Sequence, residues 1–496
     1  MRINKVTIRI ISLAAVLVLL ALPLSNLVIK SADPFKPSKI KIDTSSITGY
    51  YNQNFNWNDC YGGFLCATYK VPIDYSNLDL GEFDIAVMKH QAPNAIGNLV
   101  VNPGGPGGSG VDYAYSYESA FTEAIRDSFN IVGFDPRGVG RSTPIECLSN
   151  SETDEAYASS AYPENESEMA QMRQESKAFA ESCSNENKYL KFYSTANAAR
   201  DMDILRALLG DTKLNFLGKS YGTYLGTLYA KLFPDKVGKF VLDGAVDPTI
   251  SSLEQTLQQA VGFDNAFVAF ANDCIKDSNC VLAGDVIAQI QGKLAELHKE
   301  PLKVGNRKLT ESLAMYGIAM ALYDQEYGWP SLRSALKDLF NGEGKPLLDM
   351  ADAYTGRDSN GNYQSNDAEA LTVISCADFP PSEIKVDDVV SAAPLFGKYV
   401  AYADINCEYL PKPKYELISE PITLDSQVLV IGTTNDPATP YRWAVKLAEV
   451  LVNSKLISVS GDGHTGYNRE SDCVDQAVEK YLISGVIPAQ NLACSA

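Results

Sequence analysis

The most chemically suggestive stretch of the chain is 218–222, which reads Gly-Lys-Ser-Tyr-Gly and so matches a Gly-x-Ser-x-Gly pattern. An apolar run from Leu214 leads into it, and an apolar-periodic stretch follows as far as Phe233. This order predicts a strand, a sharp turn and a helix, with Ser220 in the strained turn. The two glycines let strand and helix approach closely. Backbone N–H groups at the helix start would stabilise negative charge, so the motif predicts a nucleophilic serine.

A serine hydroxyl is a poor nucleophile unless a histidine accepts its proton and a carboxylate fixes the tautomer of that histidine. The chain has three histidines. His464 is our candidate base, because it lies in a glycine-flanked loop after the last predicted strand, where active-site loops gather. His298 lies among charged residues of a helical segment, which indicates a solvated face. His90 ends a strand that precedes every catalytic loop.

The acid of such a group is expected between the serine and the histidine in the chain. Asp436 is our candidate, since it directly follows the predicted strand 427–432. An Asp-Pro pair is also a common turn, which is the alternative reading of Asp436. Asp462 is the rival acid, but it is only two residues from His464 and would have difficulty reaching the far ring nitrogen.

Residues 104–110 form a glycine-rich stretch that could suggest a phosphate cradle, but no Gly-Lys-Ser/Thr follows it. Beside a nucleophilic serine, such a loop supplies one N–H group to an oxyanion, and the residue after the nucleophile supplies the other. We therefore assign the oxyanion hole to Gly105 and Tyr221, because Pro106 has no N–H. Residues 358–369 resemble a calcium loop in spacing, but Tyr363 occupies the position that requires glycine, so we predict an ordinary loop, no metal and no cofactor.

The segments around these residues alternate between strand and helix patterns, which favours an α/β fold with a mostly parallel central sheet flanked by helices. Strand patterns cover 83–89, 98–102, 129–135, 214–217, 239–244, 427–432 and 455–459. Helices are predicted before 126, from 195 to 210, and from 473 to 483 at the end of the chain.

Two stretches interrupt this alternation. Residues 143–193 are polar and acidic, and we interpret them as an insertion held together by Cys147 and Cys183, with a helix at 166–182. Residues 248–421 show helical patterns without strands, for example at 253–274 and 286–298, and are predicted to form an inserted helical cap. The sheet domain would then comprise 57–247 and 422–496, the second part carrying the catalytic Asp and His, with 33–56 as a linker.

The N-terminal residues 1–32 predict an export signal, because three basic residues precede an apolar run from 10 to 22. An uncleaved N-terminal anchor is the alternative, and only in that case do we expect contact with a membrane. The net charge of −19 disfavours nucleic acid as a partner. All ten cysteines follow the signal, so disulfides are expected; the spacing suggests Cys60/Cys66, Cys274/Cys280 and Cys473/Cys494 but does not fix the connectivity.

With these pieces placed, the chain resembles the secreted tripeptidyl aminopeptidase branch of the α/β-hydrolases, which is related to the proline iminopeptidases. The resemblance spans nearly the whole mature chain and rests on the motifs at 57–60, 71–75, 102–107, 133–138, 218–222, 436–440 and 463–464. It implies an α/β-hydrolase core, a helical cap over the site, a C-terminal region of the tripeptidyl aminopeptidase type, and Ser220, Asp436 and His464 as triad. Pro103 stands where the iminopeptidases have His, which favours the tripeptidyl branch.

We therefore predict an exported serine peptidase that releases short peptides, tripeptides by the resemblance, from free N-termini of peptide substrates. The alternatives are an exported carboxylesterase or lipase with the same triad and, after it, a hydrolase-fold binding protein without activity. An exopeptidase must bind a charged amine, which calls for a carboxylate of the cap at a fixed distance from the nucleophile. Asp378 is the first candidate, because Cys376 beside it would hold it rigidly. The next candidates are Glu383, Asp404 and Glu408.

Overall fold

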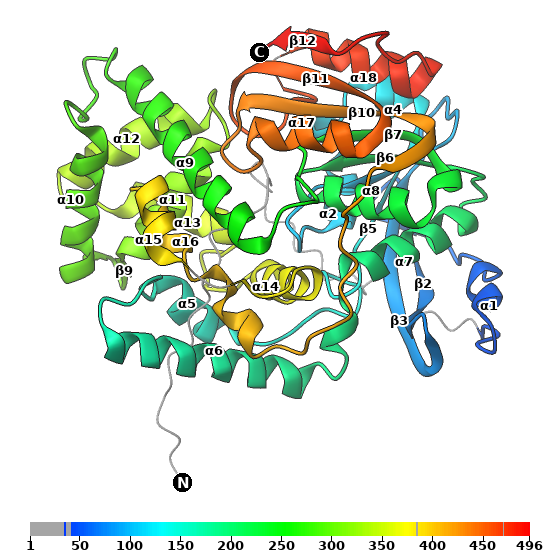
Figure 1. Ribbon diagram of the computed structural model, residues 1–496, viewed down its shortest axis with the longest axis horizontal. Helices are drawn as coiled ribbons and strands as arrows, with labels where there is room; N and C mark the ends of the chain where they lie inside the picture. The colour runs from blue at the N-terminus through cyan, green and yellow to red at the C-terminus, as the bar shows by residue number, and fades with distance from the viewer. Residues whose placement is uncertain (1–33, 36–40, 383–384, 470) are drawn as a thin grey trace.

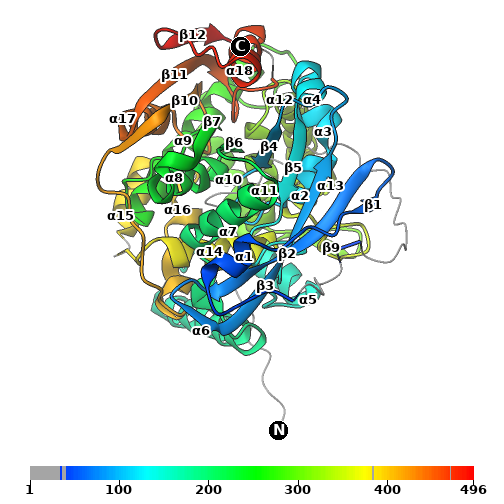
Figure 2. The same cartoon turned by 90° about the vertical axis from the view of Figure 1, so that its right-hand side faces the viewer.

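A ten-stranded sheet organises the described part of the chain (Figure 1, Figure 2). The computed structural model describes residues 34–35, 41–382, 385–469 and 471–496. The predicted export segment lies outside the described residues. Among those that are described, no helix is long and apolar enough to cross a membrane. Whether the N-terminal segment is cleaved or anchors the protein therefore stays a prediction.

The strands follow the order β1-β2-β3-β5-β4-β6-β7-β10-β11-β12 across the sheet. From β5 to β12 all neighbouring strands are parallel, whereas β1, β2 and β3 form an antiparallel edge. The predicted mostly parallel sheet is confirmed. The strand bounds are β1 (Asn58–Cys60), β2 (Phe64–Asp74), β3 (Asn77–His90), β4 (Asn98–Asn102), β5 (Asn130–Phe134), β6 (Leu214–Lys219), β7 (Val237–Asp243), β10 (Ile422–Asn435), β11 (Leu451–Asp462) and β12 (Leu492–Ser495).

Both faces of the sheet are buried, because helices cover each of them. In β4, Val100 packs into the core on one face, while Leu99 and Val101 pack into the core on the other. Successive side chains of a strand point to opposite faces, so a strand covered on both sides reads as a continuous apolar run. The helices on the first face include α7 (Thr195–Leu208), α8 (Tyr221–Leu232) and α17 (Tyr441–Val450), and those on the second include α2 (Gly110–Tyr115), α4 (Glu123–Ser128) and α18 (Asp472–Ser484).

The cap lies beside the sheet domain, as Figure 1 shows in green and yellow, and has its own apolar core. Its helices are α9 (Ser252–Cys274), α10 (Val286–Lys299), α11 (Glu311–Leu322), α12 (Gly328–Phe340), α13 (Lys345–Thr355), α14 (Asp367–Asp378), α15 (Val386–Ala392) and α16 (Gly397–Val400). The cap also contains the short helix η3 (Ala403–Glu408), and the short helices elsewhere are α1 (Ile47–Tyr51), α3 (Tyr117–Ala120), η1 (Leu190–Phe192) and η2 (Pro234–Lys236). In Figure 1, α14 lies between the remaining cap helices and the sheet domain.

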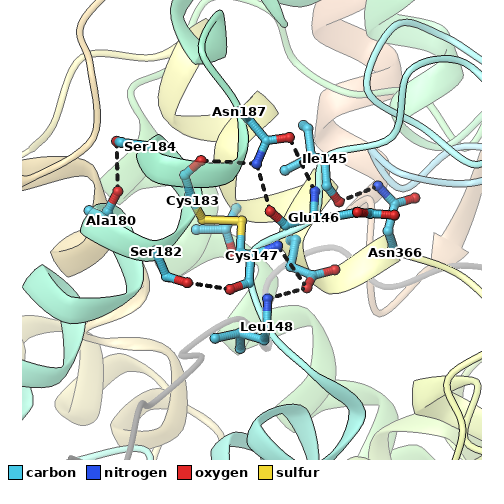
Figure 3. Close-up of a disulfide and its surroundings, with 12 residues drawn as sticks. Ile145, Glu146, Cys147, Leu148, Ala180, Ser182, Cys183, Ser184, Asn187 and Asn366 are labelled. Carbon is cyan, nitrogen blue, oxygen red and sulfur yellow. Dashed lines mark hydrogen bonds between the residues drawn. A yellow bond between two sulfur atoms is a disulfide. The ribbon is translucent and has the colours of Figure 1, made fainter. Parts of the chain in front are cut away.

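The insertion at 143–193 contains α5 (Asn150–Ala158) and α6 (Glu166–Glu186), and its start is tied to α6 and to α14. Figure 3 shows the disulfide between Cys147 and Cys183 at this junction. Asn187 donates to the carbonyl of Glu146 at 2.6 Å, and Asn366 at the start of α14 donates to the carbonyl of Ile145 at 2.9 Å. The insertion therefore braces the N-terminal end of α14.

A buried ion pair joins α7 to the antiparallel edge of the sheet. The guanidinium of Arg137, in the loop after β5, binds the carboxylate of Asp201 on α7 through two bonds of 2.7 and 2.6 Å. It also donates to the carbonyls of Pro72 and Ile73 at the end of β2, each at 3.0 Å. All three elements are thus held by one cation, whose side chain is almost completely buried.

Several elements differ from the sequence predictions. The stretch expected to be a linker contains α1, whose Tyr50 is fully buried against the sheet domain. The cap is not purely helical, since β8 (Leu302–Val304) and β9 (Arg307–Leu309) pair as a hairpin. The chain ends on β12, not on the helix at 473–483, because Leu492–Ser495 adds a parallel edge strand beside β11. These runs of three to five residues give little periodicity, so the sequence pattern did not predict them.

The ten cysteines, all within the described residues, form five disulfides. Four were suggested from sequence, and their bonds are present as Cys60–Cys66, Cys147–Cys183, Cys274–Cys280 and Cys473–Cys494. The fifth joins Cys376 on α14 to Cys407 in η3. The spacing of that pair carried no signal, because the two residues meet only through the packing of the cap.

Candidate active site

Ser220 is the single residue between β6 and α8, and its backbone angles are φ 54° and ψ −126°. A positive φ is rarely adopted by a residue with a Cβ, so the turn is strained, as the motif predicts. A Cβ on Gly218 would lie 2.5 Å from the carbonyl oxygen of Gly222, which is closer than real Cβ atoms come. Glycine is therefore required where the strand and the helix meet. The N–H of Ser220 donates to the carbonyl of Asp243 at 2.8 Å and ties this turn to the end of β7.

Asp436 lies in the loop after β10 and faces His464. Both carboxylate oxygens lie 2.8 Å from His464 Nδ1. The same carboxylate accepts from the N–H groups of Ala438 and Thr439, at 2.9 and 2.8 Å, which fixes its orientation. The rival Asp462, at the end of β11, instead accepts a hydrogen bond from Asn435, the last residue of β10, at 3.1 Å.

His464 is buried, and its ring is oriented from both ends. A carboxylate on Nδ1 selects the tautomer with the proton on that nitrogen and leaves Nε2 free to accept one. Nε2 is buried and has no hydrogen-bond partner among the described residues. Tyr323 of the cap packs its ring edge-on to the imidazole, with centroids 5.3 Å apart. The backbone carbonyl of Tyr323 also accepts a hydrogen bond from the backbone N–H of His464 at 3.0 Å. The cap thus contributes directly to holding the base.

The glycine-rich loop packs against the serine. A Cβ on Gly104, which has φ +116°, would lie 2.9 Å from the Cβ of Ser220. Gly105 and Tyr221 line the same cavity as Ser220. Tyr221 is the first residue of α8, so its N–H has no acceptor within the helix. The two predicted oxyanion donors are therefore brought to the same cavity as the serine.

This cavity, of about 80 Å³, extends from Ser220 into the cap and contains two of the four carboxylates considered from sequence. Asp378, at the end of α14, accepts from the N–H and hydroxyl of Thr195 at 2.7 and 2.5 Å. Burial raises the pKa of Asp378 to about 7, and the Thr195 hydrogen bonds oppose this rise. Asp404, in η3, accepts from Ser252 at 2.6 Å, and burial raises its pKa as well.

Glu408, the third of these carboxylates, does not line the cavity. Glu408 is exposed and forms an ion pair with Arg173 of α6, so it faces away from Ser220. Glu383 lies outside the described residues. Cys376, two residues before Asp378, is bonded to Cys407, and both cysteines line the cavity.

A polar stripe on α9 also lines the cavity and was missed in the sequence. It consists of Ser252, Gln255, Thr256 and Gln259, at the i, i+3, i+4, i+7 spacing of one helix face. Gln255 Nε2 is buried and has no hydrogen-bond partner among the described residues. A polar stripe on a helix of the cap was the signal that could have identified this face.

The remaining sequence candidates have other surroundings. Asp358 uses its carboxylate on the N–H groups of Asn360 and Asn362, at 2.9 and 2.8 Å, while Glu369 is buried in α14 and accepts from Leu148 at 3.1 Å. Asp358 and Glu369, at the two ends of the stretch with calcium-loop spacing, therefore accept hydrogen bonds from different segments of the chain. His298 is partly exposed, and its Nδ1 lies 2.8 Å from the buried carboxylate of Glu311.

The fold and the sequence agree with comparisons to known proteins. A family model for the alpha/beta hydrolase fold matches residues 97–468. The chain is 36% identical over 462 residues to serine protease Hip1 of Mycobacterium tuberculosis (strain ATCC 25618 / H37Rv), covering 87% of this chain and 88% of the relative. It is 35% identical over 450 residues to carboxylesterase B of the same strain, covering 87% and 86%.

A tripeptidyl aminopeptidase of Streptomyces lividans is 29% identical over 472 residues, covering 89% of this chain and 86% of the relative. Each of these three relatives is named for a hydrolytic activity, and two of them are named as peptidases. Since the family model matches most of the chain and two relatives exceed 30% identity over most of it, this chain belongs to the α/β-hydrolase family and is a hydrolase related to serine proteases and aminopeptidases.

Proposed function

We propose that this hydrolase is an exported serine aminopeptidase that removes short peptides, in the first instance tripeptides, from free N-termini. One observation carries the proposal: a single cavity contains the serine at the strained turn and, within the cap, the buried carboxylates Asp378 and Asp404. A nucleophile and a carboxylate able to bind an amine, both lining one cavity, are what an N-terminal exopeptidase requires. The names of the related serine protease and tripeptidyl aminopeptidase support the same assignment.

In the proposed reaction, Ser220 Oγ attacks the carbonyl carbon of the substrate while His464 Nε2 accepts the hydroxyl proton. Asp436 keeps the Nδ1 proton in place and stabilises the imidazolium. The N–H groups of Gly105 and Tyr221 hold the negative oxygen of the tetrahedral intermediate. His464 then gives its proton to the departing amine, and water, activated by the same imidazole, hydrolyses the acyl-enzyme to release the N-terminal peptide.

The substrate ammonium would be bound at the cap end of the cavity by Asp378 and Asp404. A charge-assisted hydrogen bond gains strength where water is excluded, and an unpaired buried carboxylate gains most from a cationic partner. The amide of Gln255, which has an unpartnered donor in the same cavity, is placed to donate to a backbone carbonyl of the substrate.

Export is part of the proposal because the chain combines an N-terminal segment of signal type with cysteines that are all bonded among the described residues. Disulfides of this number persist outside the reducing cytosol. A cell-surface protein anchored through the N-terminal segment is the alternative. Fractionation of cells into medium, envelope and cytosol, with N-terminal sequencing of the exported form, decides between them.

An exported carboxylesterase is the second candidate, and the similarity to carboxylesterase B favours it. The deciding experiment compares a tripeptide p-nitroanilide with a free amine, the same compound acetylated at its N-terminus, and a short p-nitrophenyl ester. The proposal expects efficient cleavage of the free peptide, loss of cleavage on acetylation, and no turnover by Ser220→Ala. Turnover of the ester alone would instead assign an esterase, and equal turnover of free and acetylated peptide would reject the exopeptidase.

A further inference from the structure

Lys219, the residue directly before the nucleophile, is buried in the sheet domain beneath the catalytic loops. Its ammonium lies 3.8 Å from the carboxylate of Asp243, which is completely buried at the end of the neighbouring strand β7. The two residues are register partners in the parallel β6–β7 pair. A buried lysine or aspartate costs free energy in the absence of a partner. Two such charges at one buried position therefore suggest a role other than keeping the protein soluble.

Both members of the pair bind the loop that carries His464. Asp243 accepts from the N–H groups of Gly466 and Tyr467, at 2.8 and 2.9 Å. Lys219 donates to the carbonyl of Tyr467 at 2.8 Å. One ion pair therefore satisfies the N–H groups of Gly466 and Tyr467 and the carbonyl of Tyr467, which lie two and three residues after His464. Gly244, next to Asp243, is also close to the imidazole, since a Cβ there would lie 3.2 Å from His464 Cε1.

We propose that Lys219 and Asp243 form a clamp that positions His464 against Ser220, and that Lys219 also prevents Asp243 from acting as a second negative charge on the imidazole. This inference rests on the proposed triad and deepens it. The clamp joins three loops through one contact set: the strained turn after β6, the end of β7 and the loop after β11. Lys219 and Asp243 are positioning residues, because neither touches the substrate.

The charged groups around His464 support an electrostatic role for Lys219. Asp436 faces the ring from the loop after β10 and Asp243 from β7. Arg469 of the same loop pairs with Asp324, which follows α11, at 2.8 Å, and Asp475 lies on α18, where it accepts from the N–H of Asn468. Burial lowers the pKa of Lys219 to about 8 and raises the pKa of Asp243, and each of the two groups opposes the shift of the other. Lys219 and Asp243 therefore balance each other beside the base.

The test replaces Lys219 by Met, alone and together with Asp243→Asn. In Lys219→Met, we expect kcat to fall with little change in KM, because the base is displaced while the cap cavity is untouched. The unbalanced Asp243 should stabilise the imidazolium of His464, which moves the acid limb of kcat/KM to higher pH. In the double variant the acid limb should return toward its original pH, while kcat stays low because the loop has lost its clamp.

A second measurement reads the base without catalysis. The chain has three histidines, so the His464 imidazole can be titrated by NMR in the Ser220→Ala background, with His464→Gln to assign its signal. The matched control is Lys239→Met, a half-buried lysine on β7 that donates to the carbonyl of Leu482. A Lys219→Met protein with normal kcat, or with an unchanged His464 pKa by NMR, overturns the proposal. If Lys219→Met does not fold, Asp243→Asn must lower the His464 pKa for the proposal to stand. Failure of the peptidase assignment would show separately, as turnover of the ester without the peptide, and failure of the serine assignment as activity that survives in Ser220→Ala.

Discussion

The raised pKa of Asp378 makes a quantitative prediction about how the enzyme recognises a free amine. Only the ionised carboxylate binds an ammonium strongly, and burial brings its pKa to about 7. Below that pH the proton occupies the site, so recognition of the amine weakens as the pH falls. From pH 5.5 to 7.0 the ionised fraction rises from roughly 3% to about 50%, a factor of about 16. Burial also raises the pKa of Asp404, which acts in the same direction.

The assay measures kcat/KM for a tripeptide p-nitroanilide with a free amine and for a neutral p-nitrophenyl ester across this range. Because kcat/KM reports groups of the free enzyme, it senses Asp378 before the ammonium has lowered its pKa. Both substrates depend on His464, so the ratio of the two values cancels the base. We expect that ratio to increase about 16-fold from pH 5.5 to 7.0.

The substitution Asp378→Asn should remove most of this pH dependence. It should also lower kcat/KM for the peptide by roughly 10- to 150-fold, the loss of one hydrogen bond to a charged group of about 1.5–3 kcal/mol, with little effect on the ester. The matched control is Glu408→Gln, a carboxylate of the same cap segment that faces Arg173 and not the cavity. A ratio that is flat with pH and unchanged by Asp378→Asn would refute the assignment of the amine to this carboxylate.

Three further outcomes follow from the structure. Ser220→Ala and His464→Ala should each lower kcat by about a millionfold, and the double variant should be little slower. Asp436→Asn should lower kcat by about ten-thousandfold, and near-normal activity of this variant would contradict our choice of acid. Thiol titration of the denatured, unreduced exported protein should find almost no free thiol, and two or more per chain would contradict the pairing. Arg137→Met should lower the free energy of unfolding by about 3–5 kcal/mol in denaturant titrations, because it strands the buried Asp201, while Lys345→Met at an exposed pair should change it little.

The sequence by itself determined the parts of the molecule that are encoded locally. The apolar run before Ser220, the glycines around it and the helical period after it specify a strand, a strained turn and a helix, because each depends on neighbouring residues alone. The chain order of nucleophile, acid and base could be read from loops that follow strands. It led to Asp436 and His464, which the structure brings within hydrogen-bond distance.

Only the tertiary structure decided which buried groups meet across the fold. Lys219 reads as an arbitrary residue of the motif until the register of β6 and β7 places it beside Asp243. Asp404 and Glu408 lie in one short segment, yet one lines the cavity and the other faces Arg173. Burial and charge partners depend on strand order and on how the cap packs. These are long-range properties, so a pattern of neighbouring residues does not contain them.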